Sequence, residues 1–180
     1  SDYSAVREQL EAQLAEEDLD SLYSELMQID PPSALLYIEK NPRRIIRALE
    51  YYYTALDYAK KTNDSSETAN LHSNIAQINV KTGRYDEAIR NFQISLEYDK
   101  AMGNQGGIAT NLSALGKVYE HWGKYDDAIN YFNQALEIDR KIGNEAKVAI
   151  RLSALASIYK AKGDFNKALK YLDEALQIDL

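Results

Sequence analysis

The chain has 180 residues, of which 45% are apolar and 27% charged, and its formal net charge is −7. This composition is typical of a globular protein rather than a disordered one. The absence of cysteine excludes disulfides, thiol catalysis and cysteine-based zinc sites, but it leaves the cellular compartment open. No apolar run approaches the ~20 residues that span a bilayer, so the sequence predicts no membrane segment.

The negative charge is concentrated in residues 1–30, which hold nine acidic residues and, as their one basic residue, Arg7. The rest of the chain has 20 basic and 19 acidic residues without a basic run, which argues against nucleic acid as a partner. Apolar residues recur at helical spacing from Val6 to Ile29, and Pro31-Pro32 ends this pattern. We interpret residues 1–30 as a helical N-terminal cap, with masking of a binding groove as the alternative.

A phrase of seventeen residues recurs at a period of 40. It reads GRYDEAIRNFQISLEYD from Gly83, GKYDDAINYFNQALEID from Gly123 and GDFNKALKYLDEALQID from Gly163. A weaker copy in the same register lies one period upstream, with Arg43 in place of the glycine. The pattern predicts a repeat array over 31–180, with units at 31–68, 69–108, 109–148 and 149–180. No polar capping helix follows the last unit, so this end of the array is predicted to lack a cap.

Each unit is predicted to form two helices. In the third unit Leu112 and Leu115 lie on one face of a first helix, and Gly123 then ends that helix. Ala128 and Phe132 follow on the apolar face of a second helix. Because one helix pair cannot bury its own apolar faces, successive pairs must stack. The sequence therefore predicts an all-α protein built from stacked antiparallel helix pairs.

These positions resemble the tetratricopeptide repeat, whose pattern is W-x2-L-G-x2-Y…A-x3-F. The third unit meets it with Leu112, Leu115, Gly116, Tyr119, Ala128 and Phe132. The period of 40 exceeds the usual 34, and Arg140 stands where a closing proline is expected. Both departures resemble the extended variety found in kinesin light chains, Pins-type proteins and bacterial regulators. The resemblance implies a right-handed superhelical α-solenoid.

The sequence offers no convincing set of residues for catalysis, for a metal or for a cofactor. His72 falls in the register position of Leu112 and Leu152 and is predicted to be a core residue. His121 is predicted to lie at the polar end of a first helix. Acidic pairs such as Asp126-Asp127 fall in the first turn of a second helix, where they interact favourably with the helix dipole. A small-molecule-binding or enzymatic helical domain is the rival interpretation.

The resemblance implies that the first helices line a concave face that binds a protein or peptide segment. The predicted binding residues are Asn70, Ser73, Asn74, Gln77, Lys81, Thr110, Ser113, Lys117, Glu120, His121, Ser153, Ser157 and Lys160. Because lysine recurs along this stripe, the partner is predicted to be acidic or to present a carboxylate. Self-association through the uncapped ends stays open. We interpret the array as the regulatory or sensing part of a longer protein.

Overall fold

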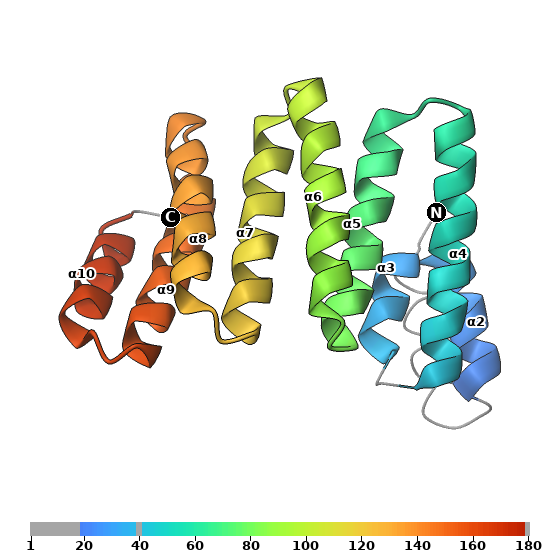
Figure 1. The fold of residues 1–180 in the computed structure, drawn as a ribbon, viewed down its shortest axis with the longest axis horizontal. Coiled ribbons are helices and arrows are strands. Elements are labelled where there is room, and N and C mark those ends of the chain that lie inside the picture. The colour runs from blue at the N-terminus through green and yellow to red at the C-terminus, as the bar shows by residue number, and fades with distance from the viewer. Residues whose placement is uncertain (1–18, 39–40, 179–180) are drawn as a thin grey trace.

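The computed structural model describes residues 19–38 and 41–178, and every regular element within them is helical (Figure 1). In chain order the elements are α2 (Leu19–Ile29), α3 (Pro31–Ala34), the 3-10 helix η1 (Leu35–Tyr37), α4 (Pro42–Lys61), α5 (Ser65–Lys81), α6 (Tyr85–Met102), α7 (Gln105–His121), α8 (Tyr125–Lys141), α9 (Glu145–Ala161) and α10 (Phe165–Leu176). Residues 1–18 of the predicted acidic leader lie outside the described residues.

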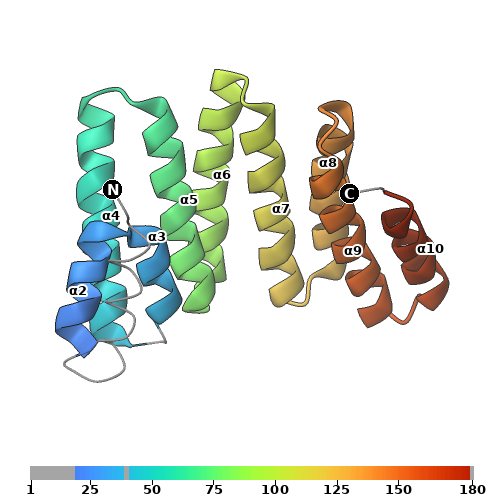
Figure 2. The same cartoon turned by 180° about the vertical axis from the view of Figure 1, so that it is seen from behind.

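The helices from α5 onward form three antiparallel pairs, α5 with α6, α7 with α8 and α9 with α10. Consecutive pairs stack through α6 on α7 and through α8 on α9, and α4 packs on α5. Figure 1 shows a row of helices from α2 at one end to α10 at the other, and Figure 2 shows the same row from behind. The all-α solenoid of stacked helix pairs, predicted from the repeat, is confirmed.

The first helices of the three pairs begin at Ser65, Gln105 and Glu145. These starts lie four residues before the predicted unit starts at 69, 109 and 149. A repeating pattern can be divided at any point of its period, so the division into units stays a prediction.

The N-terminal end of the row differs from the three pairs because α3, which precedes α4, is only one turn long. Pro31-Pro32 occupies the start of α3, where a missing backbone N–H is no loss, and Asp30 caps this turn. α2 packs beside α3 and α4. Its Tyr23 and Leu26 are fully buried. α2 therefore supplies apolar surface that the short α3 cannot supply.

From α5 onward, tight turns with a left-handed glycine connect consecutive helices, whereas Asn63 takes this place between α4 and α5. Gly123 after α7 has a φ of +78°, and Gly143 after α8 has a φ of +71°. A side chain is strained in this region of backbone conformation, which explains why glycine recurs at fixed positions. Asn144 then opens α9, since its side-chain oxygen accepts a hydrogen bond from the backbone N–H of Lys147 at 3.2 Å.

Small residues allow the two helices of a pair to approach closely. Ala128 of α8 is fully buried. On α7, a Cβ atom added to Gly116 would lie 2.9 Å from Cδ2 of Phe132, so this position has no room for a side chain. Phe132 is itself fully buried. The predicted core roles of Ala128 and Phe132 are confirmed.

Candidate functional site

A groove of about 370 Å³ runs along the first helices of the three pairs. We name it the first-helix groove, and its lining residues are Ser73, Gln77, Val80, Lys81, Phe92, Thr110, Ser113, Ala114, Lys117, Val118, Lys147 and Arg151. All of them belong to α5, α7 or α9 except the one residue from α6. The groove therefore joins surfaces from three successive repeats.

Helical spacing explains why these side chains share one face of each helix. On α5, Ser73, Gln77 and Lys81 follow one another at intervals of four residues. On α9, Lys147 and Arg151 have the same interval. Residues that are four apart are neighbours on a helix surface, so each first helix contributes one stripe. Stacking of the pairs then places the stripes side by side.

The structure brings together about half of the predicted binding residues. Those that line the first-helix groove are Ser73, Gln77, Lys81, Thr110, Ser113 and Lys117. Those that do not line it are Asn70, Asn74, Glu120, His121, Ser153, Ser157 and Lys160. Asn70 is exposed and Asn74 half-buried on α5, whereas Glu120 and His121 lie at the C-terminal end of α7. The three residues of α9 are exposed.

The stripe that α9 contributes is one that the sequence interpretation missed. The groove contains Lys147 and Arg151 of α9, whereas Ser157 had been expected there. Ser157 stands one period after Lys117, which does line the groove. Ser157 is exposed but does not line the groove, which an earlier turn of α9 closes through Lys147 and Arg151.

A buried ion pair holds Arg151. Its Nε donates a hydrogen bond to Oδ2 of Asp139 at 3.1 Å, and the two side chains are 5% and 3% exposed. One repeat earlier, Nδ2 of Asn111 donates to Oδ2 of Asp99 at 2.8 Å, in the same register. The signal that would have revealed this contact is an aspartate that recurs with the period and is followed twelve residues later by a polar residue.

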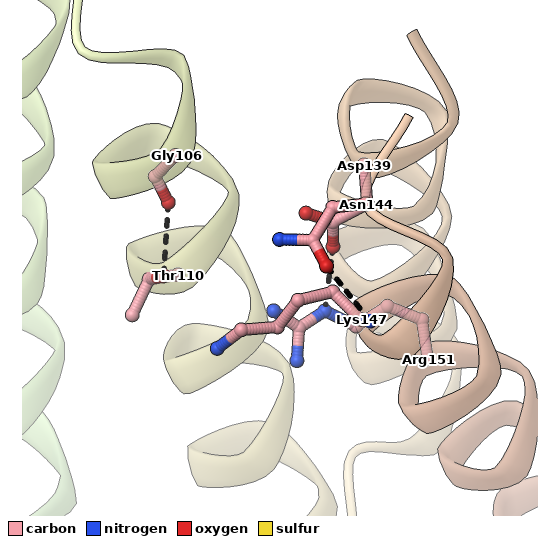
Figure 3. A network of polar contacts seen from close by, with 6 residues as sticks. All are labelled: Gly106, Thr110, Asp139, Asn144, Lys147 and Arg151. Carbon is pink, nitrogen blue, oxygen red and sulfur yellow. Dashed lines mark hydrogen bonds and ion pairs between the residues drawn. The ribbon is translucent and has the colours of Figure 1, made fainter. Parts of the chain in front are cut away.

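Positive charge dominates the first-helix groove. Lys81, Lys117, Lys147 and Arg151 line it, and its described lining includes no acidic residue. Figure 3 shows Lys147 and Arg151 extending from α9 toward α7, with Asp139 beside the guanidinium. Asp139 offsets the charge of Arg151, but the lysines have no acidic neighbour in the lining. A groove lined by one sign of charge attracts ligands of the opposite sign.

The two histidines lie in different environments. His72 is buried in α5, where Nδ1 lies 2.8 Å from Oδ1 of Asn91, and burial lowers its pKa below the ordinary value of 6.5. This burial agrees with its predicted core role. His121 is exposed at the end of α7. In the described part of the chain, no group of three or more His, Asp or Glu residues is placed to hold a metal ion.

Within residues 19–38 and 41–178, none of the helices combines the length and apolar character needed to cross a bilayer.

Comparisons with solved structures give likenesses over nearly the whole chain. A Rap protein complexed with competence and sporulation factor matches with a TM-score of 0.73 and 20% identity, covering 97% of this chain and 46% of that chain. A signal transduction ATPase of the STAND class with a tetratricopeptide repeat sensor, from Pyrococcus horikoshii, gives 0.66 and 18%, covering 98% and 33%. A putative kinesin light chain from Podosopora anserina gives 0.62 and 16%, covering 98% and 95%. These likenesses show the fold.

Sequence comparisons give short matches to enzymes and a long match to one repeat family. Segments of 47 and 50 residues are 47% and 48% identical to tRNA dimethylallyltransferases of Corynebacterium glutamicum and Deinococcus radiodurans. They cover 26% and 28% of this chain, which spans only 16% of the length of each enzyme. The sequence model of the tetratricopeptide repeat matches residues 43–101, 67–141 and 107–180. Because these matches overlap into one continuous array, the chain belongs to the tetratricopeptide repeat family.

Proposed function

We propose that the array is a protein-interaction module that binds a protein or peptide segment along the first-helix groove, on the concave side of the solenoid. The observation that carries this proposal is the groove, whose lining comes from α5, α7 and α9 together. A ligand that contacts three successive repeats at once has to be extended, and a peptide segment meets this requirement. We further propose that the array is the regulatory or sensing part of a longer protein.

The side chains of the groove suit binding better than catalysis. Ser73, Gln77 and Thr110 offer hydroxyl and amide groups that can hydrogen-bond to a peptide backbone. The described lining contains neither histidine nor a carboxylate, the groups that most often act as general bases. This chemistry favours a non-enzymatic module over the rival interpretation of an enzymatic or small-molecule-binding domain.

Two structural neighbours support the proposal. One is a Rap protein that was solved with competence and sporulation factor bound, and another carries its tetratricopeptide repeats as a sensor. This chain spans less than half of either protein, so a regulatory role for it is a proposal made by analogy. The matches to tRNA dimethylallyltransferases span too little of those enzymes to support an RNA-modifying activity.

Selection of random phage-displayed peptides against the whole chain tests the proposal. Thr110→Trp places a bulky neutral side chain on the middle helix of the groove. Thr54→Trp on α4 is a matched control, because both threonines are exposed and both hydroxyls donate to the carbonyl four residues earlier, at 2.9 and 2.8 Å. We expect the selected peptides to lose binding to the Thr110 variant and to retain binding to the Thr54 variant.

Two results would contradict the proposal. One is a set of selected peptides that bind both tryptophan variants as well as they bind the unmodified chain. The other is a selection that enriches no peptide. Circular dichroism of both variants confirms that each keeps its helical content, so that loss of binding reports on the groove.

A further inference from the structure

The α9 wall of the first-helix groove presents a guanidinium with unused hydrogen-bond donors. Arg151 is 4% exposed, and within the described residues Nε is its only nitrogen that donates to a protein acceptor. A guanidinium has further N–H donors on its two terminal nitrogens. Figure 3 shows the end of the Arg151 side chain directed toward α7. These donors therefore face the groove rather than the protein core.

Asp139 fixes the orientation of this guanidinium. The Asp139 side chain is 3% exposed at the end of α8, and its Oδ2 lies 3.1 Å from Nε. An arginine held through Nε still offers its two terminal nitrogens as a planar fork, which matches the two oxygens of a carboxylate. Lys147 lies one turn earlier on α9, and Lys117 lines the same groove from α7.

The equivalent position in α7 shows what a purely structural role requires. There, Nδ2 of Asn111 donates to Oδ2 of Asp99 at 2.8 Å and to Oγ of Ser95 at 3.0 Å, within the buried contact. Oδ1 of Asp99 accepts a further hydrogen bond from Nδ2 of Asn104 at 2.8 Å, so two amides without any charge are sufficient to satisfy this buried aspartate. Arg151 satisfies Asp139 with a single nitrogen and keeps two amino groups in addition. Satisfying the aspartate does not require these extra donors, whereas binding an anion does.

We propose that the α9 wall is a carboxylate-binding site, with Arg151 as its anchor and Lys117 and Lys147 as flanking charges, and that its ligand is an acidic peptide segment. This inference rests on the proposed peptide-binding function and deepens it. A segment with several carboxylates fits better than a single terminal carboxylate, because the cations are spread over three helices, with Lys81 on α5. Charge complementarity of this kind sets specificity and the rate of association.

Fluorescence anisotropy with the whole chain tests the site. The probe is a labelled Gly-Ser peptide with several glutamates at spaced positions, and its twin has glutamine at those positions. We expect the glutamate peptide to bind at low salt and the glutamine twin to bind roughly tenfold more weakly, since a charged hydrogen-bonding pair is lost. We also expect the affinity for the glutamate peptide to fall as salt screens the lysines.

Charge reversal maps the site on the protein. Lys147→Glu and Lys117→Glu are each expected to weaken binding of the glutamate peptide by roughly tenfold. Lys160→Glu is the matched control, because Lys160 is exposed on the same helix as Lys147 but does not line the groove. At about 0.15 M salt, where the Debye length is about 8 Å, we expect this control to retain its affinity within about twofold, because Lys160 lies about 20 Å along α9 from Lys147.

The anchor is tested by two variants. Arg151→Lys keeps the positive charge but loses the planar fork. We therefore expect it to lower the affinity for the glutamate peptide roughly tenfold and to leave the affinity for the glutamine twin unchanged. Asp139→Asn combined with Arg151→Gln removes the anchor without leaving a buried carboxylate unpaired. This double variant is expected to lose the same affinity while its thermal unfolding stays cooperative.

Equal affinities for the two peptides, including no binding of either, would overturn the carboxylate site. A loss in Lys160→Glu as large as that in Lys147→Glu would overturn it as well. If the phage selection yields groove-dependent peptides without acidic residues, this inference fails and the proposed function stands. If the selection yields no groove-dependent peptide, both fail.

Discussion

α8 and α10 carry the same apolar stripe in the 40-residue register, but only α8 buries it. Phe132 and Leu136 of α8 are 0% and 4% exposed, whereas Leu172 and Leu176 of α10 are 43% and 83% exposed. The exposures differ because α9 packs on α8, whereas α10 lies at the end of the row of described helices (Figure 1). The same sequence pattern is therefore core in one repeat and surface in the next, depending on the neighbouring repeat.

Packing within a pair does not show this difference. Ala128 and Ala168 occupy the same register position, and both are buried, at 0% and 6% exposed. The comparison separates two kinds of contact. The alanine position is buried in both repeats, whereas burial of the apolar stripe depends on the next helix in the row.

Deleting residues 1–30 has the largest expected effect, since it converts the covered N-terminal end into one resembling the α10 end. Tyr23 and Leu26 are fully buried in the same core cluster as Tyr52 of α4. We expect the deletion to unfold the first unit or to cause aggregation, measured by circular dichroism and size-exclusion chromatography. A stable deletion variant with tighter binding of an acidic peptide would instead support the masking role of the leader.

Phe132→Ala and Leu172→Ala test the comparison directly. We expect Phe132→Ala to lower the free energy of unfolding by about 3–5 kcal/mol, because it opens a cavity between Gly116 of α7 and the α9 side chains of the same core cluster. Leu172→Ala at the same register position is expected to lose only about 1 kcal/mol, because its side chain is partly exposed. Urea denaturation measures both. Equal losses would show that the α10 stripe is covered in solution.

Ala128→Leu and Ala168→Leu test the contact within a pair. Each substitution adds volume at a close helix crossing, so each is expected to lose about 1–3 kcal/mol of unfolding free energy. The two losses are expected to be similar, in contrast to the Phe132 and Leu172 pair. An unchanged melting temperature for Ala128→Leu would contradict the assigned helix register.

The contacts within a pair could be predicted from the sequence, because they repeat with its period. Ala128, Phe132 and the turn at Gly123 all follow from the 40-residue register and from helical spacing. Lys147 and Arg151 could not be assigned to the groove in this way. Their placement depends on how one pair is rotated against the next, and a first-helix stripe chosen by register alone selects Ser157 instead. The repeat pattern does not predict the identity of a ligand, since the repeated positions mainly serve packing between helices.

The exposed stripe of α10 has the smallest expected effect on stability but a measurable effect on association. Phe165, Leu169, Leu172 and Leu176 are 62%, 59%, 43% and 83% exposed and follow one another at helical spacing, so they form a continuous apolar surface. We expect this surface to cause weak, concentration-dependent self-association, which sedimentation velocity detects. Leu176→Lys is expected to reduce the association and to change the free energy of unfolding by less than about 0.5 kcal/mol, because its side chain is almost fully exposed.

Ile46→Lys on α4 is a matched control, since Ile46 is also exposed, at 54%, but lies far along the row from α10. A sedimentation coefficient that does not change with concentration would show that the end of the row stays unpaired, and an equal effect of the control would place the association surface elsewhere.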